Sequence, residues 1–224
     1  MVAETTIKTN IEQVQERIAR ACQRAGRSPE EVTLVAITKT IEPSAIAAAF
    51  RLGIKHFGEN RVQEAAPKIK ELSSLEPRPT WHMVGHLQTN KAKVAIEIFD
   101  IVQSVDSVRL AEVLSRRTEK TLPILLEVNV SGEASKSGLS IGELPPALEM
   151  ISGLPNLEIK GLMTVAPLVA DAGQVRPVFS RLRSLRDSLG LEHLSMGMTD
   201  DFEVAIEEGA TMVRVGRAIF GERA

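Results

Sequence analysis

The chain has 224 residues, of which 43% are hydrophobic and 25% charged, the balance of a soluble globular protein. Its net charge of -2 gives no electrostatic reason to expect binding to nucleic acid or a membrane, and the single Cys22 excludes an internal disulfide. No apolar run approaches the roughly 20 residues that span a bilayer, and the N-terminus has no signal-peptide pattern, so we expect a cytoplasmic protein.

Helical and strand patterns alternate along the whole chain. Apolar residues at intervals of three or four predict a first helix from Ile7 to Cys22, which Gly26 ends. Short apolar runs then predict eight strands, at 32–39, 54–60, 81–85, 101–105, 124–129, 157–164, 193–198 and 211–216. Helices are predicted between them, at 45–50, 62–72, 90–98, 107–119, 141–151, 175–189 and 200–208.

Strands that alternate with helices indicate a parallel sheet. Eight of them favour a closed (β/α)8 barrel, the TIM-barrel fold, over an open sheet, and no Gly-x-Gly-x-x-Gly follows the first strand as a dinucleotide fold would require. We therefore expect one α/β domain over residues 1–224, with the extra N-terminal helix plugging or flanking the bottom of the barrel.

A lysine follows a buried strand in the stretch 33–39, Thr-Leu-Val-Ala-Ile-Thr-Lys. Because side chains alternate along a strand, Val35, Ile37 and Lys39 share one face. Desolvation by this apolar wall would lower the pKa of Lys39 and make its amine a nucleophile for a carbonyl carbon. The alternative is a strand-end lysine that reaches solvent.

Active sites of such barrels lie at the carboxyl ends of the strands. The side chains and glycines predicted there are Lys39, Asn60, His86, Asn129, Met163, Thr164, Ser195, Thr199, Arg214 and Gly216. The sequence therefore predicts that these residues converge on one mouth.

The stretch 195–201, Ser-Met-Gly-Met-Thr-Asp-Asp, joins a strand end to a helix start. Barrels often bind phosphate with the loops after strands seven and eight, where free N–H groups favour an anion. Gly216, at the end of strand eight, would let the backbone approach the same phosphate closely. Asp200 and Asp201 must then point away from the phosphate. The alternative makes Thr199 a plain helix cap.

Arg214 is predicted to face the barrel interior, where a guanidinium needs an acceptor. Asn60 and Asn129 end their strands with hydrogen-bonding amides, although each could equally begin a loop. His86 is a candidate base or a capping residue. The histidines show no metal-ligand spacing, so we expect no metal.

A carbonyl-reactive lysine, a phosphate cradle and an arginine between them fit one cofactor, pyridoxal 5'-phosphate. Six segments resemble the pyridoxal phosphate homeostasis protein family, whose barrel is like the N-terminal domain of alanine racemase. They are VAITKT (35–40), FGENRVQE (57–64), WHMVGHLQTNK (81–91), GLMT (161–164), SMGMTDDFE (195–203) and RVGRAIFG (214–221). The resemblance covers nearly the whole chain, in order.

The resemblance implies a monomeric barrel in which Lys39 forms the Schiff base with the cofactor. It implies phosphate contacts by Ser195, Gly197, Thr199 and Gly216, a contact of Arg214 with the pyridine nitrogen, and contacts of Asn60 and Met163 around the ring. Two positions depart from the family pattern: Thr199 replaces a common serine, and Arg217 replaces a small hydroxyl residue, which puts one phosphate donor in doubt.

Three functions fit these residues. The resemblance favours a carrier that holds pyridoxal phosphate reversibly, serves vitamin B6 and amino-acid homeostasis, and meets cofactor-free enzymes transiently. The alternatives are an amino-acid racemase with the same cofactor and a lysine-dependent aldolase. Lys136, in the loop after strand five, could substitute for Lys39 as the amine, although a solvated loop charge is the simpler interpretation.

Overall fold

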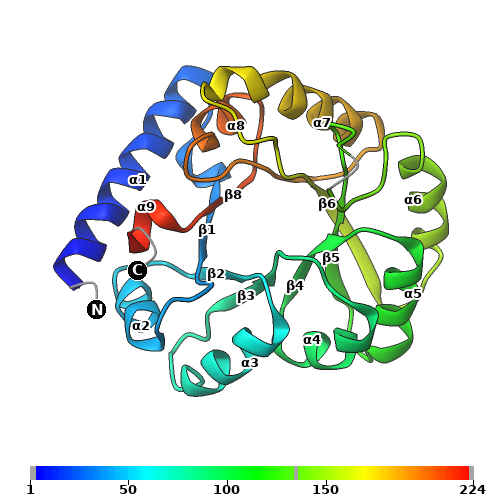
Figure 1. Ribbon diagram of the computed structural model, residues 1–224, viewed down its shortest axis with the longest axis horizontal. Coiled ribbons are helices and arrows are strands. Elements are labelled where there is room, and N and C mark those ends of the chain that lie inside the picture. The colour runs from blue at the N-terminus through cyan, green and yellow to red at the C-terminus, as the bar shows by residue number, and fades with distance from the viewer. Residues whose placement is uncertain (1–3, 134–135, 222–224) are drawn as a thin grey trace.

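The computed structural model describes residues 4–133 and 136–221, and its strands form one closed parallel barrel in sequence order, β1 to β8 (Figure 1). This confirms the predicted (β/α)8 barrel. The strands are β1 Thr33–Ile37, β2 His56–Glu59, β3 Thr80–Met83, β4 Ile101–Val105, β5 Leu122–Glu127, β6 Leu157–Met163, β7 His193–Ser195 and β8 Met212–Val215. Registers such as Ala36 with Phe57 on one side and with Val215 on the other close the ring at β1.

The helices form the outer layer of the barrel (Figure 1). The α-helices are α1 Glu4–Ala25, α2 Pro43–Arg51, α3 Val62–Glu71, α4 Ala92–Ile98, α5 Val108–Arg117, α6 Leu144–Ser152, α7 Arg176–Ser188, α8 Phe202–Glu207 and α9 Arg217–Phe220. Short 3-10 helices lie at η1 Pro29–Glu31, η2 Thr89–Lys91 and η3 Ala172–Val175. Among the described residues, no helix is long and apolar enough to cross a membrane.

Helix α1 does not lie at the bottom of the barrel, so that prediction was wrong. It packs in the outer ring against α2, α8 and α9, as Figure 1 shows. The helix after β8 is only the four residues Arg217–Phe220, which leaves part of the ring uncovered. The apolar face of α1, from Ile7 to Cys22, is buried there and completes the ring.

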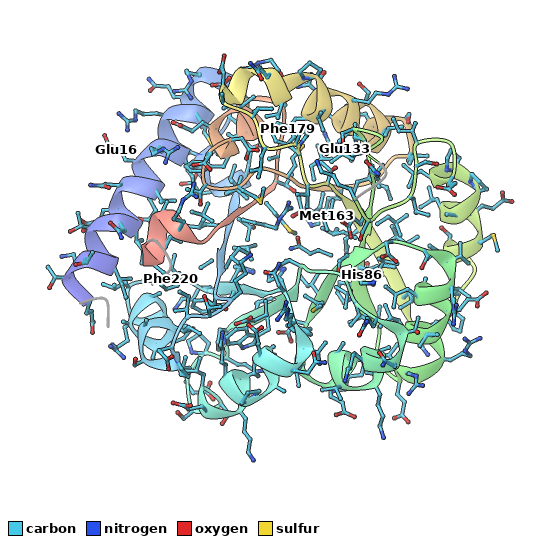
Figure 2. The ribbon with its side chains drawn as sticks, in the orientation of Figure 1. Glu16, His86, Glu133, Met163, Phe179 and Phe220 are labelled. Carbon is cyan, nitrogen blue, oxygen red and sulfur yellow. The ribbon has the colours of Figure 1, made fainter. Side chains whose placement is uncertain are left out.

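Alternation along the strands divides the buried side chains into two layers. Outward-facing residues such as Phe57 and Trp81 join the large core between strands and helices. Inside the barrel, Leu125, Met163 and Met212 form a small separate cluster. Figure 2 shows Met163 toward the middle of the barrel.

Several predicted elements end earlier or begin later than expected. Strand β1 stops at Ile37, because the chain turns through Thr40, whose φ is 64°. Strand β7 stops at Ser195, because Gly197 has a φ of 89°. Helix α8 begins at Phe202 rather than at residue 200, and α6 begins at Leu144, after a turn. The mouth is therefore built more from loops, and less from strand ends, than the sequence predicted.

Candidate functional site at the barrel mouth

Lys39 lies in the loop that follows β1, half-buried, rather than in the strand itself. Thr38, the residue before it, is held by Lys68 of the outer helix α3. The Lys68 ammonium donates to the Thr38 carbonyl at 2.7 Å and to Glu59 Oε1 at 2.8 Å, and the Thr38 hydroxyl donates to the same carboxylate oxygen at 2.7 Å. Because Glu59 is fully buried, these charge-assisted bonds fix the start of the loop and hence the place from which Lys39 projects.

Arg214 is 4% exposed and finds the acceptors that a buried guanidinium needs. One terminal nitrogen donates to the Ser195 hydroxyl at 2.6 Å, and the other donates to the Thr164 carbonyl at 2.8 Å. The structure thus brings together residues from the ends of β6, β7 and β8. The guanidinium is fixed across the top of the barrel.

The carboxyl groups of Glu127 and Asp201 interact electrostatically with Arg214. Burial lowers the pKa of Arg214 to about 10, while the charges of Glu127 and Asp201 act in the opposite direction. Burial, with the neighbouring charge of Asp106, raises the pKa of Glu127 to about 7, against the opposing charges of Arg214 and His86. Glu127 can therefore hold or release a proton near neutral pH, where the neighbouring arginine is charged.

This raised pKa predicts how stability depends on pH. Between the ordinary value of 4.5 and about 7, the folded protein holds a proton that the unfolded chain releases, so the Glu127 contribution to stability falls as pH rises. Glu127→Gln removes that loss. We expect the variant to gain up to about 3 kcal/mol in free energy of unfolding at pH 8 and nothing at pH 4.

Urea unfolding of cofactor-free protein from pH 4 to 8 measures this difference. Glu112→Gln, which removes a carboxylate from the outer helix α5, is the control for loss of charge. If the free energies of unfolding of Glu127→Gln and the original chain differed by the same amount at every pH in this range, the prediction would be contradicted.

The loop between β7 and α8 has the form of an anion cradle. The Met198 N–H donates to Asp201 Oδ1 at 2.5 Å, and Asp200 pairs with Arg217 at 2.5 Å, so both carboxylates have partners. Among the described residues, no acceptor is recorded for the backbone N–H groups of Gly197 and Thr199. Such N–H groups, together with the nearby start of α8, favour an anion.

The two predicted cradle glycines differ in how strictly the structure needs them: Gly197 is required, and Gly216 is only tightly packed. At Gly197 the φ of 89° is combined with close packing, since a Cβ there would lie 2.5 Å from Ala205 Cβ and 2.8 Å from Phe202 Cα. At Gly216 a Cβ would lie 3.3 Å from the Ile37 carbonyl oxygen. Ile37 is two residues before Lys39, so the loop after β8 lies beside the lysine.

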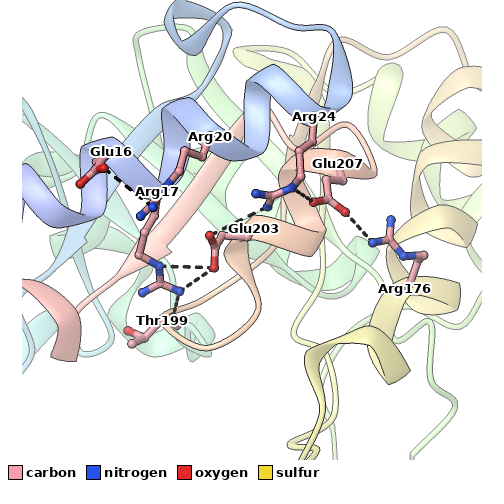
Figure 3. A network of polar contacts seen from close by, with 8 residues as sticks. All are labelled: Glu16, Arg17, Arg20, Arg24, Arg176, Thr199, Glu203 and Glu207. Carbon is pink, nitrogen blue, oxygen red and sulfur yellow. Dashed lines mark hydrogen bonds and ion pairs between the residues drawn. The ribbon is translucent and has the colours of Figure 1, made fainter.

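Helix α1 supports the outside of this loop (Figure 3). The Arg17 guanidinium donates to the Thr199 carbonyl at 3.4 Å and to Glu203 at 3.0 Å, and lies over the Phe202 ring at 4.4 Å. Farther along, Arg24 of α1 and Arg176 of α7 both pair with Glu207, at 2.6 and 2.5 Å. The cradle is thus tied to the outer ring by charged contacts.

The remaining predicted residues lie at different depths around the mouth. Met163 is fully buried in the interior cluster. His86 is exposed, with Nδ1 2.8 Å from Asp106. The Asn129 amide donates to the Glu133 carbonyl within its own loop. The Asn60 Oδ1 is buried and has no hydrogen-bond donor among residues 4–133 and 136–221.

Two cavities flank the mouth. One, of about 450 Å³, lies by β2 and β3 and is lined in part by Asn60, Arg61, His86 and Lys91. The other, of about 180 Å³, lies by β5 and β6, and its lining includes Glu127 and Lys136. The Lys136 ammonium donates to the Val165 carbonyl at 3.3 Å and pairs with Glu133 at 2.7 Å, so it is not a simple solvated charge.

These residues fit a phosphorylated pyridine aldehyde. The cradle offers N–H donors and no room for a Cβ at Gly197, which suits a phosphate held by backbone. The buried Asn60 Oδ1 has no donor within the described part of the chain, and a ligand hydroxyl could supply one. The individual roles of Lys39, Asn60, Met163, Ser195, Gly197, Thr199, Arg214 and Gly216 remain predictions.

Sequence reasoning missed several residues of the site. Glu127 lies two residues before Asn129 and two after buried Leu125, and this alternation could have placed its carboxyl inside the barrel. Gln103 and His82 could have been found in the same way, since both lie in strands and are fully buried. The Glu59–Lys68 pair carries no comparable signal, because it joins a strand to the helix behind it.

Comparison with known proteins assigns the family. The model of the alanine racemase N-terminal domain family matches residues 9–224. A pyridoxal phosphate homeostasis protein from Pseudomonas aeruginosa is 45% identical over 224 residues, which cover 98% of this chain and 96% of the relative. The structure of PipY from Synechococcus elongatus with PLP bound is 38% identical, covers 93% of this chain and 100% of that one, and has a TM-score of 0.81.

A likeness to the racemases themselves concerns the fold alone. Alanine racemase from Corynebacterium glutamicum is 17% identical, with a TM-score of 0.72, and covers 98% of this chain but 61% of its own. The family is assigned from the match to the homeostasis proteins, which covers nearly the whole of both chains at a much higher identity. The chain belongs to the pyridoxal phosphate homeostasis protein family, built on the barrel of the alanine racemase N-terminal domain.

Proposed function

We propose that this chain is a carrier of pyridoxal 5'-phosphate that binds the cofactor reversibly and takes part in vitamin B6 and amino-acid homeostasis. The bound cofactor would supply an aldehyde that condenses with the Lys39 amine, releasing one water, and hydrolysis of the resulting Schiff base would return it. The proposal includes one cofactor-binding domain over residues 1–224.

The observation that carries the proposal is the arrangement of three groups around one mouth. Lys39 projects from a loop clamped by Lys68 and Glu59. The cradle at Gly197 and Thr199 presents backbone N–H groups, and the guanidinium of Arg214 is fixed at the top of the barrel. PipY, which shares this fold at 38% identity, has a solved structure with PLP bound.

The same site argues against efficient catalysis on amino acids, and we propose that the protein is not an enzyme. A cation next to the pyridine nitrogen disfavours its protonation and narrows the chemistry towards racemase-like proton exchange. Racemisation needs a base on each face of the cofactor, and Lys39 can serve one. The sequence contains no tyrosine, the side chain that acts from the other face in alanine racemases. His86, the other candidate, is exposed and bonded to Asp106.

An exposed mouth also suits exchange of the cofactor with partners. We propose that these are cofactor-free pyridoxal phosphate enzymes, met transiently by a monomer in the cytoplasm. We expect neither nucleic acid nor a membrane to be a partner, because the net charge of -2 gives no electrostatic attraction to either.

One experiment tests the function with two measurements on the same protein. Titration with pyridoxal phosphate should produce a saturable visible band, and pyridoxal should bind far more weakly, because each charge-assisted phosphate contact contributes about 1.5–3 kcal/mol. The loaded protein should then exchange the Cα proton of alanine in deuterated water no faster than free cofactor does. Equal affinity for the two compounds would contradict the proposed phosphate cradle. Enzyme-like exchange would contradict the carrier function and favour a racemase.

A further inference from the structure

A continuous chain of hydrogen bonds runs through the inside of the barrel and ends at Arg214. The Arg214 guanidinium donates to Ser195 at 2.6 Å, and the Ser195 hydroxyl donates to Gln103 Oε1 at 2.6 Å. The Gln103 amide nitrogen lies 2.8 Å from His82 Nδ1, and His82 Nε2 lies 3.0 Å from His56 Nδ1. Five strands contribute one side chain each, and Ser195, Gln103 and His82 are fully buried.

The directions of the bonds in this chain follow from the arginine at one end and from the orientation of the Gln103 amide in the middle. A guanidinium can only donate, so the Ser195 oxygen accepts from it, and the Ser195 hydroxyl in turn donates to Gln103 Oε1, which faces it. The Gln103 N–H group then faces His82, whose Nδ1 must be the bare, accepting nitrogen. His82 therefore carries its proton on Nε2 and donates to His56.

The chain also requires His82 to stay uncharged. A second proton, on Nδ1, would face the Gln103 N–H group, donor against donor. Burial lowers the pKa of His82 to about 3, in agreement with this geometry. The amide of Gln103 is thus held in one orientation by an acceptor on one side and a donor on the other.

We propose that Gln103, held by His82, is a positioning residue that fixes the Arg214 guanidinium toward the pyridine nitrogen of the cofactor. This inference rests on the proposed function for the identity of the ring. It assigns the Ser195 hydroxyl to Arg214 rather than to the phosphate. Without Gln103, the hydroxyl loses its acceptor, and Arg214 can turn toward the carboxylates of Glu127 and Asp201, which already interact with it.

Gln103→Met is the direct test, because methionine keeps the volume but can neither accept from Ser195 nor donate to His82. Val102→Ala is the matched control: it shortens a fully buried, outward-facing side chain of the same strand by two methyl groups, and it costs stability without touching the hydrogen-bond chain. The readout is the ¹⁵N signal of pyridoxal phosphate labelled at the ring nitrogen, followed from pH 6 to 9 on the bound cofactor.

We expect the ring nitrogen to stay unprotonated in the original chain and in Val102→Ala. In Gln103→Met its pKa should rise by about one unit or more, because the cation that opposes protonation is no longer held in place. Affinity should fall about tenfold for pyridoxal phosphate and for pyridoxal alike. A folded Gln103→Met protein with an unchanged ring signal would overturn the proposal.

Two further measurements keep the inference testable if Gln103→Met does not fold or the cofactor does not bind. Ser195→Ala should shift the ring signal in the same way and lower both affinities equally, and a loss confined to pyridoxal phosphate would return the hydroxyl to the phosphate and overturn the inference. In cofactor-free protein, ¹⁵N NMR should find His82 protonated on Nε2 from pH 5 to 8. Protonation on Nδ1 would refute the chain itself, whereas an original chain without a visible band would refute the proposed function.

Discussion

Replacing Lys39 by alanine should abolish the covalent attachment of pyridoxal phosphate and the visible band of the loaded protein. The reason is positional: the loop that carries Lys39 is clamped at Thr38 by the Lys68 ammonium, 2.7 Å from its carbonyl, and Gly216 packs against Ile37 on the other side. Non-covalent contacts of the cradle would remain, so we expect weak binding of the free aldehyde, without the Schiff-base band, rather than no binding.

Borohydride reduction followed by peptide mapping measures the attachment directly. It should tag Lys39 in the original chain and leave the Lys39→Ala protein unmodified at low cofactor concentration. Lys136→Ala is the control, because Lys136 borders the second cavity and is bonded to Val165 and Glu133. An unchanged band in Lys39→Ala, lost only when Lys136 is also replaced, would transfer the covalent role to Lys136.

The fold could be predicted from the sequence because its signals are local. Each strand is a short apolar run followed by a helical period, and eight such units leave few arrangements other than a closed barrel. The predicted strand ends placed Lys39, Arg214 and the loop at Gly197 at the carboxyl end of the barrel, where the structure has them. The residues at which β1 and β7 end could not be predicted, because they depend on turns at Thr40 and Gly197, whose φ angles are 64° and 89°.

What the sequence did not predict depends on partners far apart in the chain. Gln103 meets Ser195 across 92 positions, and Arg17 meets Glu203 across 186. No local pattern pairs such residues. The place of α1 was missed for the same reason. It packs against α8 and α9, near the other end of the chain, where the short α9 leaves part of the ring uncovered.

Replacing Gly197 by alanine should displace the backbone of the phosphate cradle. The backbone there adopts a φ of 89°, which costs an L-residue about 1–2 kcal/mol. The added Cβ would also lie 2.8 Å from Phe202 Cα, a backbone atom at the start of α8 that cannot move alone. Overpacking of this kind costs about 1–3 kcal/mol more and pushes the loop out of place.

Gly190→Ala separates the two effects. Gly190 also has a positive φ, of 65°, but no atom of the residues that the structure describes lies within 4 Å of the position of its Cβ. It precedes β7, at the end of the barrel opposite the mouth. We expect Gly190→Ala to lower the free energy of unfolding by about 1–2 kcal/mol and to leave both affinities unchanged. Gly197→Ala should lower the affinity for pyridoxal phosphate at least about tenfold, as expected when a charge-assisted contact is lost, and that for pyridoxal hardly at all. Titrations of both variants with the two compounds measure the ratio of the affinity for pyridoxal phosphate to the affinity for pyridoxal. If Gly197→Ala kept that ratio, the loop between β7 and α8 could not be the phosphate cradle, however much stability the variant had lost.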